Sequence, residues 1–285
     1  MPIGRVLDGR QAARDIYVQV RREVELLLRE HGVRPSLAAI VVGDDPPSQL
    51  YIRNKQRACR EVGIDPQIQR LSPDVTEDEL VHLIYRLNRD PKVHGILVQL
   101  PLPERALENA ALAEIAPEKD VDGLSPTSQA CLLSGQAGLR PCTPLAVIEL
   151  IDRTGTDLTG KRAVVVGASA LVGKPLALML LERNATVVLC HEFTLDLAAE
   201  VGSADVLVSA VGKAELIRGD WLRPGAVVID VGINRTPDGV RGDVHFDSAR
   251  QRAGFITPVP GGVGPMTVAM LVSNTLRAAQ RLTYG

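Results

Sequence analysis

The chain has 285 residues, enough for two domains of ordinary size. Its 32 basic and 34 acidic residues leave a formal net charge of −2 and are interspersed, which excludes the basic surface that a nucleic-acid partner requires. Hydrophobic residues make up 45% of the chain but aromatic residues only 3%; aliphatic cores of this kind favour an α/β fold with parallel sheets over a β-sandwich.

The first half of the chain alternates helix and strand patterns. Apolar residues three and four apart predict an amphipathic helix over residues 10–31, which Gly32 ends. The elements expected after it are strands over residues 37–42, 68–71 and 95–99, a helix over residues 48–62, and a helix that a capping box opens at Thr76. Such alternation predicts right-handed βαβ crossovers and a parallel sheet.

A second α/β run follows a polar stretch that contains several prolines. The strands expected in this run lie over residues 162–166, 186–191, 206–211, 226–231 and 255–259. Helix-length segments separate most of these strands, which is typical of a Rossmann-like sheet, and Asp238-Gly239 indicates a turn. A long helix with apolar residues on one face is predicted over residues 266–282.

No segment indicates a membrane or secreted protein. The longest apolar runs, such as residues 163–167, are far shorter than the ~20 residues that span a bilayer, and residues 1–8 lack the apolar core of a secretory signal. We therefore expect a cytoplasmic protein with no membrane partner. The cysteines are scattered without a Cys-x-x-Cys pair, so we expect buried reduced thiols rather than a disulfide framework or a metal site at Cys59, Cys131, Cys142 and Cys190.

A glycine-rich turn leads from the strand over residues 162–166 into a predicted helix. Gly167 allows a tight exit from the strand, Gly173 allows the helix to approach the sheet, and the helix N-terminus offers N–H groups to a pyrophosphate. The spacing departs from Gly-x-Gly-x-x-Gly, and two glycines in such a turn are often only structural, so both interpretations stay open. Glu192 follows the next strand, where a Rossmann fold places the residue that meets the adenosine ribose. An ordinary surface glutamate is the alternative.

A polar and aromatic patch is predicted in the first half of the chain. Ser48, Tyr51 and Lys55 lie three and four residues apart and share one face of the predicted helix. A solvated helix face is the ordinary alternative. Gln99 ends an apolar strand, at the carboxyl edge where open α/β sheets bind ligands. Two loops of unusual composition follow, at residues 119–123 and 258–267.

These motifs resemble, in order and spacing, the methylenetetrahydrofolate dehydrogenase/cyclohydrolase (FolD) family over nearly the whole chain. The matching motifs are Tyr-x-x-x-Lys at residues 51–55, Val-Gln-Leu-Pro-Leu-Pro at 98–103, Lys-Asp-Val-Asp-Gly at 119–123, Pro-Cys-Thr-Pro at 141–144 and Pro-Gly-Gly-Val-Gly-Pro at 260–265. The resemblance implies two α/β domains with the active site in the cleft. Residues 1–120 with 267–285 would form the folate-binding catalytic domain, residues 141–266 the Rossmann-type dinucleotide-binding domain, and residues 121–140 the interdomain linker region.

The resemblance also implies the chemistry. It implies oxidation of 5,10-methylenetetrahydrofolate by hydride transfer to NAD(P), then hydrolysis of the methenyl product to 10-formyltetrahydrofolate, in one-carbon metabolism and purine biosynthesis. Tyr51 would stack on the folate rings, Lys55 would handle the proton of the attacking water, tuned by Gln99, and Asp122 would accept hydrogen bonds from the pterin. The other substrate contacts that the resemblance implies are Ser48, Pro260, Gly261 and Gly262.

For the dinucleotide, the implied contacts are Gly167, Ala168, Ser169, Gly173, Glu192 and Ile233. The Arg and Ser that the family usually places beside a 2′-phosphate are Ala168 and Glu192 here, so a cation is lost and an anion is gained. We therefore expect the chain to favour NAD over NADP, the family's usual cofactor. The resemblance further implies a homodimer that pairs through the dinucleotide domain.

Two alternative functions compete with this hypothesis. A reductase similar to shikimate dehydrogenase would need its own substrate lysine and aspartate signature, which we do not find in the sequence. A catalytically silent dinucleotide-binding paralogue would keep the fold without the chemistry. The presence of Tyr51, Lys55, Gln99 and Asp122 together argues against this second alternative.

Overall fold

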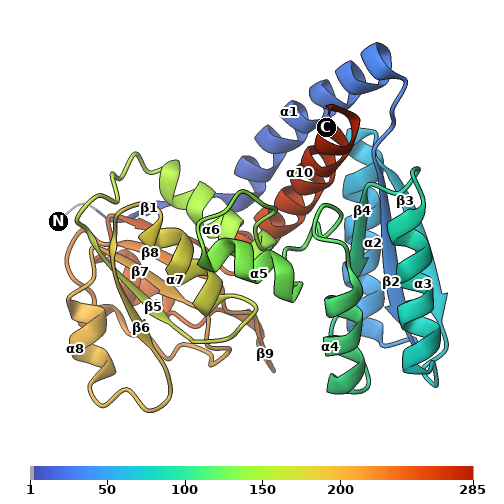
Figure 1. Ribbon diagram of the computed structural model, residues 1–285. Helices are drawn as coiled ribbons and strands as arrows, with labels where there is room; N and C mark the ends of the chain where they lie inside the picture. Colours follow the sequence, from blue (N-terminus) through green and yellow to red (C-terminus); the bar gives the residue numbers. More distant parts are fainter. Residues whose placement is uncertain (1–2, 285) are drawn as a thin grey trace. The chain divides into compact units, whose positions relative to one another are not determined.

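The computed structural model describes residues 3–284, apart from the side chains of residues 46–48. Its contacts divide the chain into two compact units, whose elements are drawn in Figure 1. Unit 1 consists of Met1–Ala13 and Thr143–Thr267, and unit 2 of Arg14–Cys142 and Val268–Gly285. The division falls inside two long helices, α1 (Gly9–His31) and α10 (Val263–Tyr284).

Unit 2 is built on a parallel sheet of three strands in the order β3-β2-β4. The strands are β2 (Ser36–Val42), β3 (Asp65–Leu71) and β4 (Gly95–Val98). The central strand β2 is buried at every residue, as an apolar run covered on both faces must be. Leu37 pairs with Gly95 of β4, and Ser36 pairs with Asp65 of β3. The carboxyl ends of β2 and β4 therefore lie next to each other.

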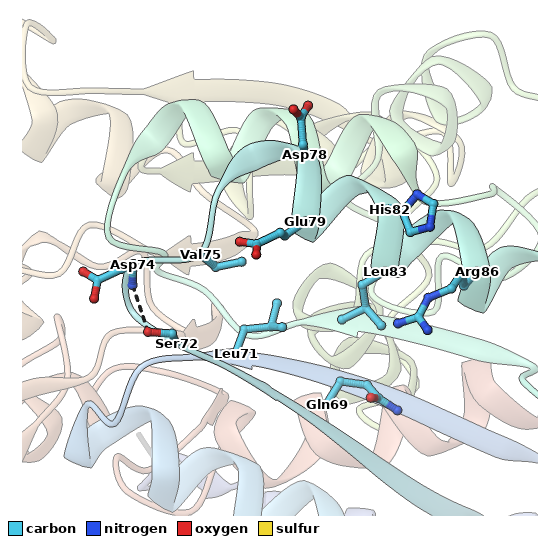
Figure 2. A pocket seen from close by; sticks show the side chains of 10 residues that line it. All are labelled: Gln69, Leu71, Ser72, Asp74, Val75, Asp78, Glu79, His82, Leu83 and Arg86. Carbon is cyan, nitrogen blue, oxygen red and sulfur yellow. Dashed lines mark hydrogen bonds between the residues drawn. The ribbon is translucent and has the colours of Figure 1, made fainter.

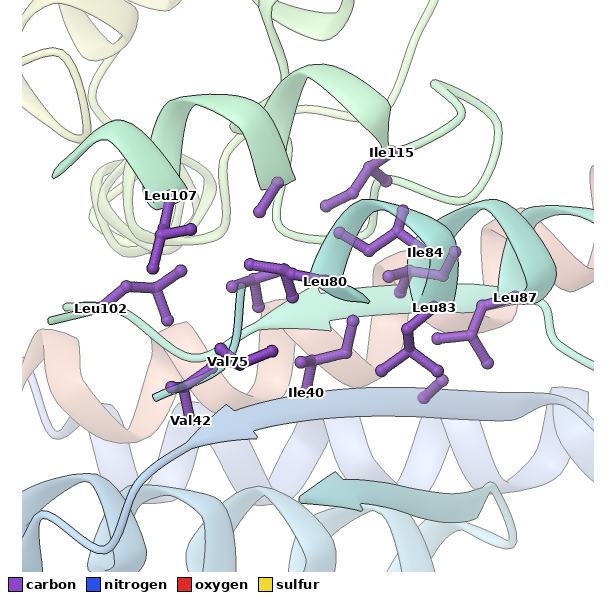
Figure 3. Close-up of a cluster of buried hydrophobic side chains, with 14 of the residues drawn as sticks. Ile40, Val42, Val75, Leu80, Leu83, Ile84, Leu87, Leu102, Leu107 and Ile115 are labelled. Atoms are coloured by element: carbon purple, nitrogen blue, oxygen red, sulfur yellow. The ribbon is translucent and has the colours of Figure 1, made fainter. Parts of the chain in front are cut away.

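One core cluster of unit 2 joins this sheet to two helices, α3 (Glu77–Arg89) and α4 (Arg105–Glu114). Figure 3 shows Ile40 of β2, Leu80 and Ile84 of α3 and Leu107 of α4 within this cluster. The predicted capping box is present at the start of α3, because Thr76 and Glu79 each accept a hydrogen bond from the other's backbone N–H.

The other helices of unit 2 include one that the sequence did not predict. The helices are α2 (Pro46–Val62) and α5 (Pro126–Leu133), with most of α1 and α10. Helix α5 lies within residues 121–140, for which we expected a linker. Its signal is present in the sequence, because Ser125 caps the helix by accepting a hydrogen bond from Ser128 N and a proline follows at the first helical position.

Unit 1 is built on a parallel sheet of six strands in the order β1-β11-β8-β7-β5-β6. The strands are β1 (Arg5–Val6), β5 (Arg162–Val166), β6 (Thr186–Cys190), β7 (Val206–Ser209), β8 (Val227–Asp230) and β11 (Phe255–Ile256). The chain adds β6 on one side of β5 and then continues on the other side with β7 and β8. The strand order therefore reverses between β5 and β7, at the switch point where doubly wound sheets bind ligands.

Shorter elements complete unit 1. They are the helices α6 (Cys142–Asp152), α7 (Gly173–Leu181), α8 (Leu197–Gly202) and α9 (Phe246–Arg250), the 3-10 helix η1 (Gly219–Trp221), and the antiparallel pair β9 (Asn234–Thr236) and β10 (Gly239–Arg241). The turn expected at Asp238-Gly239 joins β9 to β10. Strand β1 is too short for any periodic signal, and the sequence did not predict it.

Several predicted strands are longer than the observed ones, and the cause is visible at β7. The strand expected over residues 206–211 ends at Ser209. Two residues later the N–H group of Val211 donates to the side chain of Asp243 and not to a neighbouring strand. No helix among residues 3–284 is long and apolar enough to cross a membrane.

Candidate functional site

Lys55 and Gln99 form the centre of a polar cluster in unit 2. Lys55 projects from α2, one helical turn after Tyr51, and its Nζ donates a 2.9 Å hydrogen bond to Oε1 of Gln99. Gln99 follows β4 and is buried, and its Nε2 donates to the carbonyl of Leu100 at 2.7 Å. The amide is thereby held with its oxygen toward Lys55, so Nζ of Lys55 is positioned at the carboxyl end of the sheet.

Asp122 belongs to the same cluster. Burial raises the pKa of its carboxyl, while the charge of Lys55 and a hydrogen bond with the Cys142 side chain lower it, and the charge of Asp120 raises it. The structure therefore brings together three of the four residues for which we predicted catalytic roles. The fourth, Tyr51, leaves 42% of its surface exposed one helical turn from Lys55. The side chain of Ser48 lies outside the described part of the chain.

The other charged residues of the Lys-Asp-Val-Asp-Gly motif hold the loop rather than face the cluster. Lys119 is buried and its Nζ donates to the carbonyls of Leu87 and Asp90 at the end of α3. The buried Asp120 carboxylate accepts hydrogen bonds from three backbone N–H groups, those of Gly123, Leu124 and Ser125. These bonds fix the loop that carries Asp122.

Cys142 has a role that the sequence interpretation missed. We expected only a small buried thiol there, but its Sγ also donates to the carbonyl of Val121 at 3.2 Å and bonds the Asp122 side chain. Burial, and the charge of Asp122 beside it, raise the pKa of the Cys142 thiol well above its usual range. The thiol therefore keeps its proton and can act as a donor. The Pro-Cys-Thr-Pro motif was the available signal.

The glycine-rich turn of unit 1 lies at the switch point of the six-stranded sheet. A Cβ on Gly167 would lie 2.2 Å from the carbonyl oxygen of Ala210, and a Cβ on Gly173 would lie 1.7 Å from that of Gly167. Both positions therefore require glycine. Ser169 stabilises the turn. Its carbonyl accepts a hydrogen bond from Lys174 N, and its hydroxyl accepts one from Val172 N. A tight turn into the N-terminus of α7 is the backbone geometry that receives a pyrophosphate.

The remaining predicted dinucleotide contacts lie on unit 1 as well. Ala168 is partly buried in the turn, and Glu192 is exposed directly beyond the carboxyl end of β6. Ile233 lines a cavity of about 150 Å³ together with the Pro260-Gly261-Gly262 segment. The structure thus brings a predicted cofactor contact together with the predicted substrate loop, both at the carboxyl side of β8.

A wider hollow of about 770 Å³ in unit 2 contains none of the predicted residues. It lies between β3 and α3, and Figure 2 shows that Gln69, His82 and Arg86 are among the side chains that line it. Volume alone therefore does not locate the site. Within residues 3–284 no three His, Cys, Asp or Glu side chains are grouped so that they could hold a metal ion.

Fold and site define a class of protein: a dinucleotide-binding α/β enzyme that has a Rossmann-type unit and a second unit with a smaller parallel sheet and a cluster of lysine, glutamine and carboxylate side chains. The model of the tetrahydrofolate dehydrogenase/cyclohydrolase catalytic domain matches residues 7–122, and that of the NAD(P)-binding domain of the same family matches residues 141–283. The chain belongs to the tetrahydrofolate dehydrogenase/cyclohydrolase family.

Individual relatives of the family match this chain over nearly all of its length. The bifunctional protein FolD of Moorella thermoacetica is 55% identical over 277 residues, which cover 97% of this chain and 99% of that protein. The crystal structure of the bifunctional enzyme FolD from Campylobacter jejuni is similar with a TM-score of 0.94 and 44% identity, covering 97% and 98% of the two chains. That of the Trypanosoma brucei enzyme, complexed with NADP and an inhibitor, has a TM-score of 0.94 and 42% identity and covers 100% of both chains.

These findings confirm the predicted family, the two-domain α/β fold with parallel sheets, and an enzyme with dehydrogenase and cyclohydrolase domains that binds NAD(P). The alternative of a silent paralogue is not favoured.

The geometry of the turn predicts that Gly167→Ala weakens NAD(P) binding at least tenfold, because the new methyl group would displace the Ala210 carbonyl. Gly160→Ala is the matched control. Gly160 precedes β5 at its amino end and shares a positive φ, but no atom lies within 4 Å of its Cβ position. Titration calorimetry with the dinucleotide measures both variants, and equal affinities would contradict the role given to the turn.

Proposed function

We propose that this chain catalyses both reactions for which its family is named. It oxidises 5,10-methylenetetrahydrofolate with NAD(P) and then hydrolyses the methenyl product to 10-formyltetrahydrofolate. The observation that carries the proposal is the 2.9 Å bond between Lys55 and Gln99 beside Asp122. With the purified protein, methylenetetrahydrofolate and NAD(P), we expect both reduced dinucleotide and 10-formyltetrahydrofolate. Dinucleotide binding without either product would identify a silent paralogue.

The two units divide the work in this proposal. Unit 2 supplies the side chains that act on the folate, and unit 1 binds the dinucleotide, which accepts the hydride when bound. We propose residues 1–120 with 267–285 as the catalytic domain and residues 141–266 as the dinucleotide-binding domain. The two compact units differ from these bounds: the segment up to Ala13 belongs to unit 1, because β1 pairs with β11, and residues 121–140 belong to unit 2. For hydride transfer the protein mainly has to align two planar partners, so no acid or base is required for that step.

Hydrolysis requires a proton transfer, and Lys55 is the group that performs it. Water adds to the methenyl carbon, and the bond between that carbon and N5 breaks as the formyl group forms. Both protons leave the water oxygen: one ends on N5, and the other passes through the Lys55 amine to solvent. One N–H of Lys55 is already directed at Gln99, which leaves the rest of the amine to face the reacting carbon. Gln99 therefore acts as a positioning residue, and Lys55 is the catalytic residue.

Lys55→Met is predicted to lower the rate of methenyltetrahydrofolate hydrolysis by about 10²- to 10⁴-fold, the usual contribution of acid–base catalysis. Arg57→Met is the control, because Arg57 is an exposed cation on the same helix. Stopped-flow absorbance of the methenyl group gives the rates. Hydrolysis by the Lys55 variant at the wild-type rate would remove Lys55 from the mechanism.

Asp122, Tyr51 and the Pro260-Gly261-Gly262 segment bind the folate in this proposal. The carboxylate has two acceptor oxygens for the N–H and amino groups of the pterin, and the exposed ring of Tyr51 offers a flat surface for stacking. Pro260 is exposed, whereas Gly261 and Gly262 are buried, and a Cβ on Gly262 would lie 2.6 Å from the carbonyl oxygen of Pro258. In this proposal the glycines therefore let the segment pack closely and present Pro260 to the substrate.

Asp122→Asn should therefore raise the Kd for the folate substrate by at least tenfold and leave the Kd for NAD(P) unchanged, since an amide offers only one acceptor oxygen. Calorimetric titrations of both ligands on the same variant provide the comparison. If both affinities fell by the same factor, Asp122 would be a residue that maintains the loop and not one that binds folate.

We also propose that the chain favours NAD over NADP. Two features support this preference: Ala168 offers no cation to a 2′-phosphate, and Glu192 is exposed at the end of β6, where it can accept hydrogen bonds from free ribose hydroxyls. The Trypanosoma brucei relative was crystallised with NADP, so the preference separates this chain from that protein.

Glu192→Ser is expected to raise kcat/KM with NADP by about tenfold or more, because it removes a like charge from the phosphate, and to change kcat/KM with NAD less. Asp247→Ser controls for the change in net charge, since Asp247 is an exposed acid on α9. Helix α9 contacts β11, which lies toward the opposite edge of the sheet from β6. A wild-type enzyme that prefers NADP, with kinetics that Glu192→Ser leaves unaltered, would refute the preference.

A homodimer that pairs through unit 1 and a cytoplasmic location complete the proposal. In support of the dimer, β6 is an edge strand, and the loop after it exposes Phe193 and Leu195 at 79% and 104% of their surface. Unpaired strand edges and exposed apolar side chains favour association. In support of the location, the cysteines are free thiols, as reducing compartments maintain them.

A further inference from the structure

A buried carboxylate in unit 1, that of Asp243, holds the loop that follows β7. Asp243 has no exposed surface. Its oxygens accept hydrogen bonds from Ser209 Oγ at 3.1 Å, Val211 N at 2.7 Å, Gly212 N at 3.1 Å, Lys213 N at 3.0 Å and Asn234 Nδ2 at 3.0 Å. Three consecutive backbone N–H groups thus converge on one side chain that lies thirty residues further along the chain.

The loop that Asp243 holds also contacts the glycine-rich turn. Ala210 N donates to the carbonyl of Val166 at 2.7 Å, and the carbonyl of Ala210 occupies the space that a side chain on Gly167 would need. Residues 210–213 therefore lie against the glycine-rich turn, at the switch point between β5 and β7. Asp243 fixes the position of this segment.

The same carboxylate reaches the loop that follows β8. Gly232 leaves room for it, because a Cβ there would lie 2.2 Å from Oδ1 of Asp243. Asp230 completes the connection: its carboxylate accepts the N–H groups of Gly232, Asp243 and Val244 at 2.8–3.0 Å. Ile233, a predicted dinucleotide contact, lies in this second loop.

In a Rossmann-type sheet the pyrophosphate lies at the first βα turn and the adenosine extends toward the next strand in sequence. Here the adenosine half would lie over β5 and β6, and the nicotinamide half would therefore lie over β7 and β8. We propose that Asp243 is a positioning residue for the nicotinamide half of the dinucleotide, because it fixes the loops after β7 and β8 without touching the ligand. The inference rests on the proposed function of unit 1.

Asp243→Asn tests the proposal with almost no change of shape. In either orientation the amide nitrogen would face N–H donors, those of Val211 on one side or of Lys213 on the other, and two donors cannot bond each other. We expect the Kd for NAD(P), measured by calorimetry, to rise at least tenfold. At saturating methenyltetrahydrofolate the rate of hydrolysis should be unchanged, because the residues to which that step is assigned, Lys55 and Gln99, belong to unit 2. Asp247→Asn is the charge-matched control.

Ser209→Ala is a milder second variant. Ser209 is fully buried and donates to Asp243, so it can affect dinucleotide affinity only through the network. We expect a several-fold increase in Kd for NAD(P) with unchanged hydrolysis. Wild-type dinucleotide affinity in a folded Asp243→Asn protein, or equal loss of both activities in both variants, would overturn the proposal. Failure of the proposed function would appear separately, as wild-type protein that transfers no hydride.

Discussion

Backbone N–H groups that donate to buried carboxylates hold the functional loops of both units. In unit 2, Asp120 accepts three such groups from the loop that carries Asp122. In unit 1, Asp243 does the same for the loop after β7. A loop at the end of a strand has N–H groups that no ladder partner satisfies, and leaving them buried and unpaired is costly. A carboxylate is an efficient solution because it only accepts and has two oxygens.

This arrangement explains two glycines of unit 1. Gly232 and Gly242 stand where a Cβ would lie 2.2 Å from Asp243 Oδ1 and 1.9 Å from Asp230 Oδ2. They make room for carboxylates of the protein itself. The pKa of Asp230 is raised to about 7, because burial and the charge of Asp243 raise it more than the hydrogen bonds from Val244, Asp243 and Gly232 lower it. Rigid loops of this kind let the sheet ends present functional groups in fixed positions.

The sequence predicted most elements because their signals are local. The capping box of α3 and the aliphatic strands of both sheets depend on neighbouring residues alone, and the turn at Asp238-Gly239 is of the same kind. Strand β1 was missed because two residues are too few to show an alternating hydrophobic pattern, and its only strand partner is β11. Helix α5 was missed because a polar, proline-containing stretch was interpreted as a linker.

The residues of the candidate site also form two groups, those that sequence motifs indicate and those whose roles only the tertiary structure reveals. Lys55, Gln99 and Asp122 were singled out by motif and spacing, and the structure brings them together. Cys142 and Asp243 were not singled out, because their hydrogen-bond partners lie 20 and about 30 residues away along the chain. No pattern of neighbouring residues encodes which backbone groups a carboxylate will accept. Their roles depend on the tertiary structure.

One chain carries out both hydride transfer and hydrolysis on the same one-carbon unit. Mass spectrometry of the products from methylenetetrahydrofolate labelled with two deuterium atoms on that carbon tests this directly. We predict one deuterium on the reduced dinucleotide and one on the formyl group of 10-formyltetrahydrofolate. A reduced dinucleotide without deuterium, or a deuterated methenyl product that is never hydrolysed faster than in protein-free buffer, would contradict it.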